Sequence, residues 1–146
     1  MTGQTAPAEQ ANATGLSPHK AFVCLLIASA RSDGSVSPHE ANQIEHVAAA
    51  MKLFRGSSYE TRYGIFTNAA EGIKQQGIED VLRAAAAAIP AELRATAFAL
   101  AVDLMLSDGQ LTTNEQRFAD QLRALLNVGR DVAAKVIDVL TIKNAG

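Results

Sequence analysis

Two short segments of the chain carry the same acidic pattern. "SDGSVSPHE" begins at Ser32, and "SDGQLTTNE" follows 75 positions later (108 − 33 = 75, Asp33 against Asp108). Each segment holds an aspartate and, seven residues on, a glutamate: Asp33 with Glu40, and Asp108 with Glu115. Carboxylate oxygens are the ligands that hard divalent cations such as Ca²⁺, Mg²⁺ and Mn²⁺ prefer, and Zn²⁺ also accepts them. The pattern therefore suggests a site for a divalent cation, with these four carboxylates as its ligands.

Each turn resembles only half of a known calcium loop. The spacing from glycine to glutamate is that of the second half of an EF-hand loop, where a glycine makes the sharp turn and a glutamate closes the site. The first half is missing, because the positions of its first and third ligands hold other residue types: Ser29 and Arg31 in one copy, Leu104 and Leu106 in the other. Neither turn is a complete loop, so a cation site requires the two turns to approach each other.

A structural interpretation of the same residues needs no ion. Asp33 and Asp108 each follow a predicted helix, whose dipole disfavours a carboxylate there by about 0.3–1 kcal/mol. An Asx-turn compensates, with the following glycine in the left-handed conformation. Ser37 to Glu40 and Thr112 to Glu115 have the spacing of capping boxes for the next helices. Turns that only shape the fold, and turns that also bind a cation, both remain open.

Other reactive side chains give weaker signals. His39 and His46 share a helix face, but two turns, about 10–11 Å, separate them, too far for one zinc ion without another element. We expect both to be solvated, and Asp103 to face either the acidic cluster or water. The single cysteine, Cys24, lies in the apolar run "AFVCLLIASA" and is predicted to be a buried thiol. Without a nucleophile motif or a phosphate loop, the chain is predicted not to be an enzyme.

Composition narrows the class of protein. The 146 residues are 48% hydrophobic and 19% charged, which suits one domain with its own core. The net charge is −2 and the basic residues are scattered, so nucleic acid is not an expected partner. The run around Cys24 is too short to span a bilayer, and only Lys20 supplies a clear cation before it, which disfavours a signal peptide. We expect a cytoplasmic protein without membrane insertion.

Helical periodicity runs through the chain from residue 17. Residues 1–16 lack an apolar period and are predicted to form a disordered tail. The remainder, 17–142, is predicted to be one compact all-α domain with no sheet. Gly64 and Gly72 interrupt the third predicted helix and favour a break or kink there. The apolar spacing, caps and prolines give about seven helices, near residues 17–32, 37–51, 57–76, 78–90, 90–108, 112–126 and 130–141.

The repeat extends beyond the two turns. At the same offset, apolar residues match on both sides of each turn: Leu25 with Leu100, Ile27 with Val102, Val36 with Leu111, Val47 with Leu122, and Met51 with Leu126. This correspondence predicts two helix-turn-helix halves packed about a pseudo-twofold axis.

These features also carry a family resemblance. The helical run ending in "ASARSDGSVSPHE", the proline-started helix ending in "AVDLMLSDGQLTTNE", and the length between them resemble the tellurite-resistance TerB family and TerB-like domains over about residues 17–141. The resemblance implies an all-helical domain, a role in the response to tellurite or other chemical stress, and an acidic metal-binding surface. The family pattern falls on Asp33, Gly34 and Glu40, and again on Asp108, Gly109 and Glu115.

Two hypotheses follow for function. The first is a stress-response binding protein whose acidic turns bind a divalent cation and so change the surface shown to a partner. The second is a helical scaffold or adaptor, in which the turns only set helix angles and a groove binds other proteins of a stress-response system. The sequence leaves the oligomeric state open.

Overall fold

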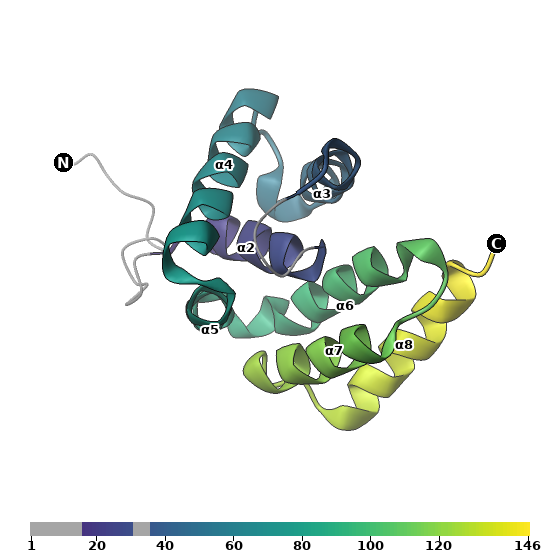
Figure 1. Ribbon diagram of the computed structural model, residues 1–146. Coiled ribbons are helices and arrows are strands. Elements are labelled where there is room, and N and C mark those ends of the chain that lie inside the picture. Colours follow the sequence, from purple (N-terminus) through teal and green to yellow (C-terminus); the bar gives the residue numbers. More distant parts are fainter. Residues whose placement is uncertain (1–15, 31–35) are drawn as a thin grey trace.

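The computed structural model describes residues 16–30 and 36–146, which form an all-helical domain (Figure 1). The predicted tail, up to residue 15, and the first acidic turn, at residues 31–35, lie outside this range. The described part contains seven α-helices and no strand, which confirms the predicted fold class and helix number. The helices are α2 (Pro18–Ala30), α3 (Pro38–Ala50), α4 (Tyr59–Gln76), α5 (Ile78–Ala88), α6 (Arg94–Met105), α7 (Thr113–Leu125) and α8 (Arg130–Lys143), with short 3₁₀ helices η1 (Lys52–Phe54), η2 (Ala91–Leu93) and η3 (Leu106–Asp108).

Helix α2 is the centre of the core. Every residue from Ala21 to Ser29 is buried, as expected of a helix that is apolar on all sides. It packs against α4, α5 and α6, and Figure 1 shows it between these helices. Its one buried polar side chain, Ser29, donates its hydroxyl proton to the Leu25 carbonyl oxygen at 2.8 Å, so no polar group is left unsatisfied there.

Small residues on α5 let that helix pack closely on α2. The buried apolar side chains of α5 lie in two adjacent pairs, Val81 with Leu82 and Ala85 with Ala86, one helical turn apart, and Ile89 is buried just after the helix. Two of them are alanines, Ala85 and Ala86, with exposed fractions of 0% and 1%. Helix α5 therefore packs against the central helix through small side chains.

Helix α4 is one uninterrupted element from Tyr59 to Gln76, so the expected break at its glycines is absent. A polar anchor holds its first turn to α3. Arg62 Nε and Nη2 donate to the Glu45 carboxylate at 2.7–3.0 Å, and Nη1 donates to the Ser57 carbonyl oxygen at 2.8 Å. Tertiary packing and this anchor outweigh the low helix propensity of Gly64 and Gly72.

Replacing both α4 glycines by alanine is expected to stabilise the protein by about 1–2 kcal/mol in total, because each substitution removes backbone entropy from the unfolded chain. A methyl group at Gly64 or Gly72 meets no atom within 4 Å, so the gain is not offset by a clash. Urea denaturation of Gly64→Ala/Gly72→Ala checks it. Gly77→Ala serves as the opposite control, since Gly77 has a φ of 91° that a side chain strains. A loss of stability in the double variant would contradict the prediction.

The predicted pseudo-twofold relation between two halves is not confirmed. Helices α2 and α6 occupy the same place in the repeat, but their environments differ. Helix α2 is enclosed almost completely, whereas α6 packs on α2, α7 and α8 and keeps half-buried or exposed residues, among them Thr96, Leu100 and Asp103. The matching apolar pattern therefore gives two similar helices in unequal positions.

No helix in the described ranges has by itself the length and apolar content to cross a membrane. One pair, α5 with η2 and α6, meets the test only when both are joined, and it bends by 112° at the break between them.

Candidate functional site

The second acidic turn follows the end of α6. The helix ends at Met105, η3 continues the chain to Asp108, and Gly109 then takes the left-handed conformation with a φ of 109°. The Gly109 amide donates to the Leu106 carbonyl oxygen at 2.8 Å. The predicted left-handed glycine is thus confirmed for this turn, and its positive φ explains why glycine is needed.

Both predicted capping boxes are confirmed, with matching geometry. The Glu40 amide donates to Ser37 Oγ at 3.1 Å, and the Ser37 amide donates to Glu40 Oε1 at 3.0 Å. In the second copy, the corresponding bonds between Glu115 and Thr112 measure 3.1 and 3.0 Å. Each box satisfies amides that the first turn of α3 or α7 would otherwise leave without an acceptor.

The four predicted metal ligands are only partly visible in the structure. Asp33 lies outside the described residues, and the Asp108 side chain is likewise not described. Glu40 and Glu115 each use one carboxylate oxygen in a capping box. Among the side chains that the structure does describe, no three His, Cys, Asp or Glu residues come close enough to hold an ion. The cation site therefore stays a prediction.

Replacing a cap residue by alanine is expected to cost about 1 kcal/mol per helix, because one amide in the first turn of the helix loses its acceptor. We expect Ser37→Ala and Thr112→Ala to lower stability by similar amounts, and the double variant to show the sum, since the boxes share no partner. Chemical denaturation of the three variants measures this. Ser58→Ala, which removes the cap at the start of α4, is a matched control of the same type.

A mostly apolar hollow of about 700 Å³ lies between α3 and α6. We call it the α3/α6 trough. Its α3 wall extends into η1, and its other wall runs from η2 along α6. Half-buried apolar side chains form much of the lining, and polar ones stand at the rim. The lining residues are His46, Val47, Ala50, Met51, Lys52, Leu53, Leu93, Thr96, Leu100 and Asp103.

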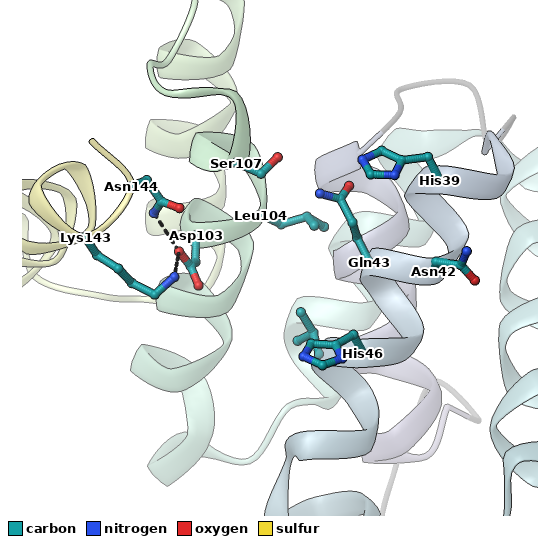
Figure 2. Close-up of a pocket in the computed structure, with 10 residues that line it drawn as sticks. His39, Asn42, Gln43, His46, Asp103, Leu104, Ser107, Lys143 and Asn144 are labelled. Atoms are coloured by element: carbon teal, nitrogen blue, oxygen red, sulfur yellow. Dashed lines mark hydrogen bonds and ion pairs between the residues drawn. The ribbon is translucent and has the colours of Figure 1, made fainter. Parts of the chain in front are cut away.

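The trough continues into a more polar hollow of about 400 Å³, which shares His46, Val47 and Asp103 with it. Figure 2 shows His46 and Gln43 of α3 on one side of this hollow, with Asp103 and Ser107 on the other. Asp103 Oδ1 accepts hydrogen bonds from Lys143 Nζ at 3.2 Å and from Asn144 Nδ2 at 2.8 Å. Asp103 therefore fastens the end of α8 to α6.

The two histidines behave as predicted for solvated residues. His39 and His46 are exposed, and both line the polar hollow. Asp103 approaches this hollow from α6, but with the histidines it does not form a metal-binding group in the described part of the chain. The polar hollow instead presents hydrogen-bond donors and acceptors at the end of the α3/α6 trough.

The trough could not be predicted from the sequence, because its apolar lining residues have the same spacing as residues of a buried core. Val47, Met51 and Leu100 belong to the matching apolar pattern of the repeat, yet with Leu93 they are only half-buried. One signal was present: apolar residues cover more of the 93–105 segment than one neighbouring helix needs. Such excess apolar surface marks a groove or an interface.

Cys24 is buried as predicted, with 2% of its surface exposed. Burial raises the pKa of its thiol to about 11, partly opposed by the charge of Lys20. The reactive thiolate is therefore scarce at neutral pH, which fits a structural role.

The fold and these surfaces define an all-α domain built around one buried central helix, with an apolar trough on its surface. The family model of the tellurite resistance protein TerB matches residues 19–138. Because that match covers most of the chain, the protein belongs to the TerB family. Searches of curated proteins and of solved structures returned no match.

Proposed function

We propose that this TerB-family chain is a cytoplasmic stress-response adaptor that acts by binding other proteins and performs no catalysis. The observation that carries the proposal is the α3/α6 trough. Its volume of about 700 Å³ and its apolar lining with a few polar groups are typical of binding sites. The lining belongs to helices held on the buried core, so the surface is largely preformed and loses little entropy on binding.

Site-specific photo-crosslinking tests the adaptor function. A photoreactive amino acid replaces Thr96, an exposed residue of the trough, in cells that naturally produce the chain, with and without tellurite. We expect a defined protein adduct that disappears when Ala50→Arg fills the trough. The same amino acid at Gln121, exposed on α7, is the control position. Identical adducts at both positions, or adducts insensitive to Ala50→Arg, would count against the proposal.

A divalent-cation site at the acidic turns is the second candidate function. The observation that favours it is that the described parts of both turns present a glutamate in the same local geometry, since Glu40 and Glu115 close matching capping boxes. With Asp33 and Asp108, these groups would supply hard oxygen ligands. A bound cation would alter the first turns of α3 and α7. Because α3 forms one wall of the trough, the cation would also affect that wall.

Isothermal titration of chelator-treated protein with Ca²⁺, Mg²⁺, Mn²⁺ and Zn²⁺ tests the cation site. We expect saturable binding that Asp33→Asn/Asp108→Asn abolishes, because amides can preserve an Asx-turn but lack the charge a cation needs. Glu92→Gln, an exposed carboxylate on η2 away from both turns in sequence, is the control for charge loss alone. Binding that survives the double substitution would place the ion elsewhere, and no binding would leave the turns as structural elements.

A further inference from the structure

A second unpartnered apolar surface lies on the last helix. Val132, Val139 and Ile142 on α8 have exposed fractions of 42%, 62% and 76%. With Lys135 they follow the spacing i, i+3, i+7 and i+10, which places all four along one side of the helix. We call this the α8 stripe. Its apolar area is exposed in the isolated chain, whereas the opposite side of α8 packs on α6.

The stripe and the trough match in length. From Val132 to Ile142 the stripe covers ten helical steps, about 15 Å at the α-helical rise. Along the trough wall, the distance in sequence from Leu93 to Asp103 is also ten residues, again about 15 Å. The stripe is convex because it is one helix face, and the trough is the hollow between two helices. The α8 stripe of one molecule can therefore lie along the α3/α6 trough of another, as a ridge in a groove.

The charges at their ends are complementary. Lys52 stands at one end of the trough and Asp103 at the other. Asp131 precedes the stripe and Lys143 follows it. In one orientation Asp131 meets Lys52 and Lys143 meets Asp103, whereas the reverse orientation opposes like charges at both ends.

The groups at these ends retain binding capacity. Both hydrogen bonds that Asp103 accepts within its own chain go to Oδ1, which leaves Oδ2 for a further donor. The side chains of Lys52 and Asp131 make no ion pair with any residue that the structure describes. A helix arriving in the favoured orientation therefore meets Lys52 without an ion pair at one end. At the other end it meets the Asp103 carboxylate, which pairs through Oδ1 with Lys143 of its own chain and keeps Oδ2 for a further donor.

We propose that the α3/α6 trough of one copy binds the α8 stripe of a second copy. The N-terminal end of the second copy's α8 then lies next to Lys52 of the first copy. The chain's own α8 cannot occupy the trough, because its other face is packed on α6 and its end is held by Asp103. The inference rests on the proposed function, since it makes the trough a binding surface and names one occupant. Self-association then competes with any other protein for the same trough.

Such an interface joins two different surfaces and is therefore head-to-tail. Each copy in a dimer still offers one free trough and one free stripe, so assembly continues as concentration rises. A single helix face buries less than the roughly 800 Å² per partner of a standard stable interface, which makes the association weak and concentration-dependent.

Sedimentation velocity of the purified full chain over a wide concentration range tests the proposal. We expect the weight-average sedimentation coefficient of the wild type to rise with concentration. Two variants are expected to remain monomeric: Val139→Asp/Ile142→Asp in the stripe and Ala50→Arg/Thr96→Arg in the trough, all at positions where the described structure leaves the side chain exposed. Gln121→Arg/Ala124→Arg on exposed α7 positions is the control and keeps the wild-type behaviour.

Mixing the two monomeric variants gives the distinguishing result. The stripe variant retains an intact trough and the trough variant an intact stripe, so the mixture forms a one-to-one complex that grows no further. The combined variant Lys52→Glu/Asp131→Lys is expected to regain association that each single substitution weakens. Circular dichroism and thermal unfolding confirm that every variant is folded.

Three outcomes overturn the proposal. A wild type that stays monomeric at every concentration removes the second copy as occupant. Association that the trough variant keeps and only the stripe variant loses shows a symmetric α8 to α8 contact. A mixture of the two variants that remains monomeric excludes the head-to-tail interface. None of these contradicts the adaptor function, which fails separately if crosslinks from Thr96 do not depend on the trough.

Discussion

Leu25→Ala is expected to lower the free energy of unfolding by about 2–5 kcal/mol, a large share of the stability of a domain of this size. Leu25 has an exposed fraction of 0% and lies on the central helix, which packs on α3, α4, α5 and α6. These neighbours are tied to the rest of the core, so they cannot collapse into the space that the substitution leaves. Urea denaturation measures the loss.

The repeat supplies the control for this prediction. Leu100 occupies the position that matches Leu25, but it is half-buried at the edge of the trough. We expect Leu100→Ala to cost roughly 1 kcal/mol, because less apolar area leaves water and no closed cavity forms. Equal losses at the two positions would mean that the two halves pack equivalently after all.

The free energy of unfolding is expected to fall by about 2–3 kcal/mol in total as the pH rises from about 9 to about 11, through the titration of Cys24. Burial raises the pKa of the folded thiol to about 11, from an ordinary value of 9.0 that the unfolded chain keeps. Between these values the unfolded chain binds fewer protons than the folded one, so stability decreases with pH. The contribution is complete below the lower value and is gone above the higher one.

Lysine and tyrosine side chains titrate in the same range, so a variant must isolate the thiol. Cys24→Ala removes the titrating group and is expected to flatten the pH dependence while lowering stability at neutral pH. The difference between the two denaturation curves, measured at several pH values, reports Cys24 alone. Parallel curves for wild type and variant would show that the thiol ionises as easily in the folded protein as in the unfolded chain.

Local signals in the sequence located the helices well. Ser37 with Pro38, and Thr112 with its glutamate three residues on, determine where α3 and α7 begin, because caps and a first-turn proline act on the nearest backbone amides. One boundary shifted: the segment after Pro90 first forms η2 and becomes α-helical only at Arg94. The break expected at the glycines of α4 is absent because the low helix propensity of glycine is a small effect beside tertiary packing.

Tertiary relations were harder to predict. The segments of α2 and α6 have similar apolar patterns, and nothing local decides that one becomes the enclosed centre and the other a trough wall. That choice depends on how α4 and α5 fold back over α2. For the same reason, the apolar pattern alone does not tell that Val47 and Leu100 line the trough. The spacing within each acidic turn predicts its capping box, but it does not determine the distance between the two turns.

The position of α2 has a consequence for biosynthesis. This helix leaves the ribosome before the rest of the domain, yet two of the helices that cover it, α5 and α6, begin only at Ile78 and Arg94. Until those segments emerge, only α3 and α4 can cover this apolar helix, and the surfaces that α5 and α6 bury stay exposed. The fold can therefore be completed only late in synthesis and depends on contacts distant in sequence, so we expect slow folding and binding of the nascent chain by chaperones.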